Sequence, residues 1–230
     1  MKTEKNYYNS RDLVEVSRRG YYSEKISFIT RNLSKIKLTN NNLKILDIAS
    51  NDGYLASMYK NYGEVTVSEM NKEGIALCKK KGLNCIEGDF FEIPESYNRK
   101  FDVVIATDII EHVFDTDEFL SKINKLLKKN GVLLLTTANV ASFARRIMLL
   151  LGINPFLEFS TLLPYKNYNV GHIRYYTLKN LYSQLKMCNF SNIKITGDKI
   201  NFSSKIYSRL LAKIFPTFAR NILAFAIKNK

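Results

Sequence analysis

The sequence lacks several features that would assign it to an exported or membrane-embedded class. It has three cysteines, which form neither a C-x-x-C pair nor an even set, so we expect no disulfide and no structural zinc. The longest apolar run, IMLLLGINPFL, has 11 residues, fewer than the roughly 18 that a membrane-spanning helix needs. The N-terminal segment 1–31 is polar and charged, unlike an export signal. We therefore expect a soluble, cytoplasmic protein.

Acidic residues are scarce in the last ninety positions. Residues 1–140 contain 21 Lys/Arg and 19 Asp/Glu, a balance of +2, whereas residues 141–230 contain 14 and 2, a balance of +12. A general lysine bias of the coding sequence would spread evenly, and this excess does not. The asymmetry indicates a localised basic surface that attracts phosphate, anionic lipid or nucleic acid.

Strand and helix patterns alternate from residue 44 onward, in a chain whose 230 residues suit one domain. The predicted strands are 44–49, 65–68, 84–86, 101–107 and 132–137. The predicted helices between them are 54–61, 72–81 and 117–129. This order predicts an α/β fold with a mostly parallel, Rossmann-like sheet covered by helices on both faces.

The flanking segments depart from this alternation. Residues 1–40 predict a helical cover, and residues 141–170 predict an insertion or lid with a helical piece at 143–151. Further along, the patterns predict a helix at 177–188 and strands at 193–196 and 222–227. Within the basic region 198–230, the segment 205–215 predicts a helix with Lys205, Arg209 and Lys213 on one face and apolar residues on the other. Such a helix suits an anionic membrane surface, and a packed helix with a solvated basic face is the alternative.

Polar residues follow several predicted strands, where ligands bind in open parallel sheets. The segment KILDIASNDGYLA, residues 44–56, ends a strand in a turn of small residues, although Ala49 and Asn51 stand where a dinucleotide loop favours glycine. Glu69 follows the second strand, about twenty residues later, where a carboxylate can accept both ribose hydroxyls. Asp89 and Phe90 follow the third strand and suit an adenine amine and ring.

Together with FDVVIATDIIEHVFD and LLKKNGVLLLTTAN, these segments resemble the class I S-adenosylmethionine (SAM)-dependent methyltransferase family over roughly residues 40–200. The Ser-Asn-Asp-Gly turn resembles that of some sugar methyltransferases, and GHIRYYTLKNLYSQL is similar to a stretch in relatives that act on quinones, sugars and other small molecules. The family resemblance implies a seven-stranded sheet with an antiparallel C-terminal strand. A nicotinamide dehydrogenase is the competing interpretation of the fold, but it favours a fuller glycine loop.

Carried over by position, the resemblance implies SAM as cofactor and a role for each matching residue. Asp47 and the turn that follows it would hold the methionine portion, Glu69 the ribose, and Thr107 the methyl end. Met70 would lie on one adenine face, with Asp89 and Phe90 at its edge. The residues of the turn are Ala49, Ser50, Asn51 and Gly53.

The acceptor side offers two histidines, His112 and His172, as candidates for removing a proton during methyl transfer. For each of them a structural role is an open alternative. Asp108, Glu111 and Asp115 form a short acidic cluster, which is a poor metal signal without further ligands, and we expect no metal.

The sequence predicts an enzyme that methylates a small molecule, such as an oxygen of a sugar, glycan precursor, lipid-linked or quinone-like compound. Peripheral association with an anionic membrane through the basic C-terminal region is a further expectation. RNA methylation is an alternative that the basic end invites, although no nucleic-acid module or Asn-Pro-Pro-Tyr-like motif is present. A non-catalytic SAM-binding, membrane-docking protein is the third interpretation.

Overall fold

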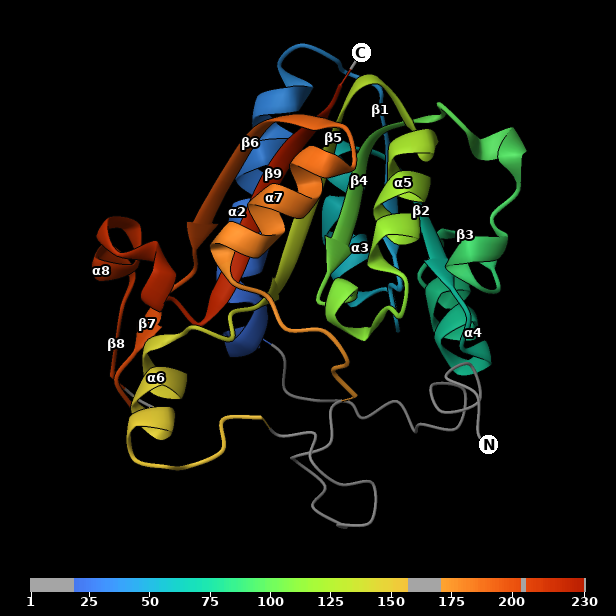
Figure 1. Cartoon of the computed structure of the whole chain (residues 1–230). Helices are drawn as coiled ribbons and strands as arrows, with labels where there is room; N and C mark the ends of the chain where they lie inside the picture. Colours follow the sequence, from blue (N-terminus) through green and yellow to red (C-terminus); the bar gives the residue numbers. More distant parts are fainter. Residues whose placement is uncertain (1–18, 157–170, 204–205, 230) are drawn as a thin grey trace.

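The computed structural model describes residues 19–156, 171–203 and 206–229, and its central feature is a seven-stranded sheet (Figure 1). The strands lie in the order β3-β2-β1-β4-β5-β9-β6, and β9 runs antiparallel to both of its neighbours while the other pairs are parallel. This arrangement confirms the predicted Rossmann-like sheet with an antiparallel C-terminal strand. The strands are β1 (Leu43–Ile48), β2 (Gly63–Glu69), β3 (Asn84–Glu87), β4 (Phe101–Thr107), β5 (Leu127–Ala138), β6 (Phe190–Gly197) and β9 (Asn221–Lys228).

Helices cover both faces of the sheet, and the sheet separates the two main layers of the core. On one face, Phe119 and Leu120 of α5 and Leu181 of α7 pack against the strands; on the other, Ile29 of α2 and Tyr59 of α3 do so. Within the described residues, no helix is long and apolar enough to cross a membrane. The helices are α2 (Arg19–Lys37), α3 (Tyr54–Tyr59), α4 (Lys72–Lys80), α5 (Thr116–Leu126), α6 (Phe143–Leu150), α7 (Leu178–Met187) and α8 (Arg209–Ile214).

The bounds of two predicted helices differ most from those in the structure. The helix expected at 117–129 ends at Leu126, because Leu127 is fully buried and pairs with Phe101 as the first residue of β5. The basic helix expected at 205–215 is shorter, since β8 (Tyr207–Ser208) pairs with β7 (Ile200–Asn201) before α8 begins. Of the remaining expectations, those on residues 1–18, 157–170 and 204–205 lie outside the described part of the chain.

The turn between β1 and α3 contains three residues with left-handed backbone. Ala49, Asn51 and Gly53 have φ values of 53°, 55° and 71°. At Gly53 a side chain would also collide with Leu83, whose Cδ1 lies 2.7 Å from the position of an added Cβ. Ala49 and Asn51 thus hold a conformation that glycine adopts at lower cost, even though they are not glycines.

Replacing Ala49 by glycine should therefore stabilise the protein. We expect Ala49→Gly to raise the free energy of unfolding by about 1 kcal/mol, because an L residue with a Cβ is strained in this region. Urea denaturation measures the change, and Ala56→Gly, inside α3, is the matched control, expected to lower stability. An Ala49→Gly variant less stable than the wild type would contradict this account of the turn.

Candidate functional site

The carboxyl ends of β1 and β2 bury two acidic side chains. Asp47, at the end of β1, is 3% exposed and accepts a hydrogen bond of 2.8 Å from the Ser50 hydroxyl. Burial, opposed by this hydrogen bond and reinforced by the neighbouring Glu69, raises the pKa of Asp47 to about 7. Asp47 and Ser50, both predicted to contact the cofactor, therefore lie together at the sheet edge.

Glu69, at the end of β2, anchors the backbone around it. Its Oε2 accepts from the backbone N–H of Asn51 at 2.7 Å, and its Oε1 accepts from those of Met70 and Asn71 at 2.9 and 2.8 Å. Burial raises the pKa of Glu69 despite these donors. A carboxylate has about four lone-pair sites, so three backbone bonds leave room for one further donor, such as one ribose hydroxyl.

Asp89 and Phe90 follow β3, as predicted, and both have protein partners. Asp89 begins a short helix by accepting from the backbone N–H of Phe91 at 3.0 Å. The half-buried Phe90 ring packs on Phe119, with 4.9 Å between the ring centroids. The N–H of Gly88 donates to the carbonyl of Glu69 at 2.9 Å, which holds this turn beside the end of β2.

Two buried polar atoms at this edge lack a protein partner. Among the residues that the structure describes, Oδ1 of Asn51 and Oγ1 of Thr107 are buried without a hydrogen bond. Buried polar atoms are nearly always paired, by protein, water or ligand. Both residues were predicted to contact SAM, and the unpaired atoms fit a polar ligand lying across the ends of β1 and β4.

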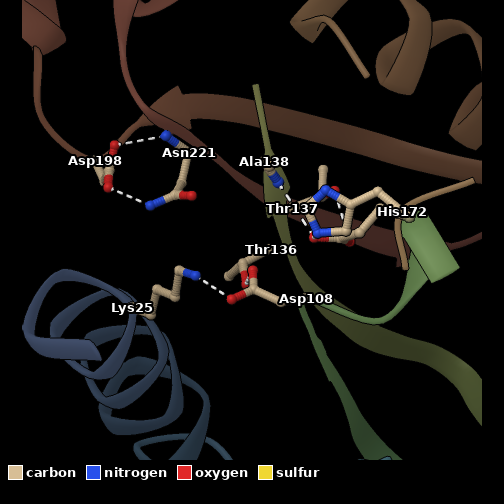
Figure 2. A network of polar contacts seen from close by, with 9 residues as sticks. Lys25, Asp108, Thr136, Thr137, Ala138, His172, Asp198 and Asn221 are labelled. Carbon is tan, nitrogen blue, oxygen red and sulfur yellow. Dashed lines mark hydrogen bonds and ion pairs between the residues drawn. The ribbon is translucent and has the colours of Figure 1, made fainter. Parts of the chain in front are cut away.

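Lys25 of α2, which was not among the predicted site residues, reaches the end of β4. Its side chain is 1% exposed and forms an ion pair with Asp108, whose other oxygen accepts from the Thr136 hydroxyl at 2.9 Å (Figure 2). Its place in the sequence could have indicated this contact, because Lys25 lies four and eight residues before Ile29 and Leu33, which are fully buried. A lysine in line with buried residues on a helix indicates an internal partner.

Glu111 occupies a buried position after β4. It is 2% exposed, and its oxygens accept from the Thr137 hydroxyl at 2.7 Å and from the Ala138 N–H at 3.4 Å. Burial, together with the charge of Asp108, raises the pKa of Glu111 to about 7. A carboxyl that titrates near neutral pH suits proton transfer.

The structure brings together the two histidines proposed as candidates for proton removal. The ring centroids of His112 and His172 are 4.8 Å apart, and Nε2 of His172 lies 4.0 Å from Oε1 of Glu111. Nδ1 of His112 is 3.0 Å from the carbonyl oxygen of Gly171, so this contact joins the end of β4 to the segment that carries His172. Figure 2 shows His172 beside Thr137 and Ala138.

The three acidic residues of the predicted cluster, Asp108, Glu111 and Asp115, have separate partners. Asp108 pairs with Lys25, and Asp115 caps α5 by accepting from the Glu118 N–H at 2.8 Å. Glu111 instead lies with the two histidines: Glu111, His112 and His172 offer ligand atoms within 4.8 Å of one another, a spacing that could hold a metal ion. Our expectation of no metal stays a prediction.

The chain is similar to known methyltransferases. A model of the methyltransferase domain family matches residues 17–195. A ubiquinone biosynthesis O-methyltransferase of Pelagibacter ubique is 36% identical over 105 residues, or 43% of each chain, and one of Rhodopseudomonas palustris is 29% identical over 108 residues, covering 42% and 40% of the two chains. The chain thus matches about two fifths of the length of these curated relatives.

Solved structures share the fold. A SAM-dependent methyltransferase from Archaeoglobus fulgidus has a TM-score of 0.64 at 18% identity, over 94% of this chain and all of its own. A phosphoethanolamine N-methyltransferase of Haemonchus contortus in complex with SAM has a TM-score of 0.61 at 16% identity, over 100% of this chain and 61% of its own.

The buried Asp47 carboxyl should leave a pH signature in stability. Its pKa rises from 3.8 to about 7 on folding, so between these values the folded state binds more protons and stability falls as pH rises. Asp47→Asn cannot ionise and keeps an acceptor for Ser50. We expect its unfolding free energy, relative to wild type, to increase over this range and then level. Urea unfolding at a series of pH values measures the difference, and parallel curves would refute it.

Proposed function

Because the chain belongs to the SAM-dependent methyltransferase family, we propose that it transfers the methyl group of SAM to a hydroxyl oxygen of a small, quinone-like or lipid-linked acceptor. The observation that carries the proposal is the placement of the His112–His172 pair and Glu111 at the same strand ends as the unpaired atoms of Asn51 and Thr107. The names of the curated relatives support an oxygen on a quinone precursor as acceptor.

The cofactor portion of the site is assigned residue by residue. Asp47 and the turn after β1 would hold the methionine end, with the unpaired Oδ1 of Asn51 as a polar contact. Glu69 would accept one ribose hydroxyl, because its other positions bind backbone N–H groups. The adenine would lie against Met70 and the Asp89–Phe90 turn.

Methyl transfer is an in-line displacement for which the bound cofactor supplies the electrophilic methyl group. The chain must align the acceptor and remove the proton of its hydroxyl. His172 is the proposed base, and the Glu111 carboxyl beside it would stabilise the positive imidazolium that forms. His112 is assigned a positioning role, since its contact with Gly171 fixes the segment that carries His172.

A lipid-like acceptor favours peripheral association with a membrane, which the basic residues 141–230 also favour. RNA methylation shares the charge argument but lacks a supporting feature at the site. The aromatic side chains next to the proposed base, with Tyr175 near His172 and Phe156 against Tyr175, suit a quinone-like ring better than a polynucleotide backbone.

Thr107→Val tests the cofactor assignment. Removing the hydroxyl assigned to the ligand should weaken SAM binding about fivefold and leave the fold intact, because Thr107 Oγ1 has no hydrogen bond to the described part of the chain. Calorimetric titration with SAM measures the affinity, and Thr196→Val on the distant strand β6 is the matched control. Equal affinities of both variants and wild type would refute the contact, and absence of binding to the wild type would refute the proposal.

His172→Ala tests the acceptor chemistry. Loss of a general base should reduce methyl transfer from labelled SAM to a catechol acceptor by about a hundredfold or more, with SAM affinity unchanged. His172→Gln controls for packing and should also be inactive, whereas His112→Asn should keep part of the activity. Label that enters only RNA among fractionated cell lipid, glycan and RNA would overturn the acceptor class, and no label in any fraction would favour a non-catalytic protein.

A further inference from the structure

Exposed apolar side chains are concentrated in two short segments. Of the 17 exposed large apolar residues in the described chain, six lie within 147–156 and six within 202–215. Leu150, Leu151 and Leu210 are among the most exposed, at 81%, 66% and 67%. Scattered apolar residues on a surface need no explanation, but a concentration of this kind marks an interaction site.

The two segments form one surface, which we call the α6–α8 surface: residues 147–156 and, of 202–215, those that the structure describes. Phe143 of α6 stacks edge-on against Phe202 and Phe218, with centroid distances of 5.4 and 6.3 Å. The guanidinium of Arg146 lies 4.3 Å from the Phe218 ring centroid. Figure 1 shows α6 beside β7, β8 and α8 at one side of the sheet. Residues separated by about sixty positions are therefore presented together.

Charge identifies the partner of this surface. The sequence contains no Asp or Glu in 141–157 or in 199–230. The same two ranges together contain nine Lys/Arg. Lys213 is exposed beside the apolar residues of α8. Exposed apolar side chains with cations on the same helices, Arg146 on α6 and Lys213 on α8, suit the boundary between headgroups and acyl chains of an anionic bilayer.

We propose that the α6–α8 surface docks onto an anionic phospholipid bilayer, inserting side chains such as Leu150 and Leu210 while Lys213 and its neighbours meet lipid phosphates. A second copy of the chain fits less well, because a symmetric contact would bring two basic surfaces together. Only the reason for docking rests on the proposed function: the docked protein would bring its site to a lipid-like acceptor.

The α6–α8 surface is continuous with the acceptor side of the site. Phe156, at the end of its first segment, packs edge-on against Tyr175, with 4.6 Å between ring centroids. Tyr175 in turn lies 6.5 Å from the ring of His172. Docking therefore holds the proposed base near the lipid phase, so an apolar acceptor can enter from the bilayer without crossing water.

Vesicle flotation of the full-length protein tests the docking. The wild type should float with vesicles of equal parts phosphatidylglycerol and phosphatidylcholine, more at low than at high salt, and much less with phosphatidylcholine alone. Leu150→Glu combined with Leu210→Glu should reduce partition at least about tenfold. Met187→Glu, which changes a residue of α7 that is also 81% exposed, is the matched control and should float like wild type.

A charge series completes the test. Lys213→Glu should lower partition about fivefold, whereas Lys179→Glu, on the exposed face of α7, should have a smaller effect. Flotation of the Leu150/Leu210 variant at the wild-type level would overturn the proposal. So would a wild-type dimer, seen by light scattering, that this variant abolishes while vesicle binding is absent.

SAM titration of the same variants separates the two proposals. We expect the Leu150/Leu210 variant to bind SAM like wild type, so that loss of flotation reports docking alone. If the wild type floats but binds no SAM, the proposed function fails and the docking stands. If it binds SAM but does not float, the docking fails.

Discussion

Negative charge buried at the ends of neighbouring parallel strands is the constraint that shapes this site. Asp47, Glu69 and Glu111 are almost fully buried, and Asp108 lies beside them at the end of β4. These carboxyl groups are accommodated in three ways. Glu69 accepts three backbone N–H groups, Asp108 pairs with an ammonium, and burial shifts the pKa values of Asp47 and Glu111 to about 7. The left-handed residues Ala49 and Asn51 belong to the turn whose N–H reaches Glu69.

The ammonium that balances Asp108 comes from outside the sheet, from Lys25 of α2. Lys25 reaches β4 because its helix face also buries Ile29 and Leu33 against the strands. The preceding residue, Glu24, pairs with Arg209 of α8. Consecutive residues of α2 therefore contact Asp108 after β4 and Arg209 of α8, and the helix connects two parts of the molecule that are distant in sequence.

The sequence predicted what depends on local pattern and missed what depends on long-range pairing. The central strands follow from β-rich runs and the strand ends from the polar residues after them. The Lys25–Asp108 pair spans 83 positions, and the contact of His112 with Gly171 spans 59, so neither produces a periodic signal. Ala49 and Asn51 stand where a dinucleotide-binding loop favours glycine. Both nevertheless adopt the left-handed backbone that glycine favours, which residue type alone does not predict. The end of α5 was missed for a related reason, since strand pairing of Leu127 overrides its helical pattern.

The division of charge along the chain follows a division of tasks. The nearly neutral first 140 residues build the edge where carboxyl groups are buried, and a cation placed freely there would compete for them; Lys25 is held in one fixed pair. Of the cations in residues 141–230, Arg146 lies on α6 and Lys213 on α8, beside the exposed apolar residues of those helices. His172 belongs to this second part but contacts Glu111 of the first, and Phe156 and Tyr175 connect it to the α6–α8 surface. The proposed base therefore stands where the two parts meet, between the strand ends proposed to hold the cofactor and the α6–α8 surface proposed to dock onto an anionic bilayer.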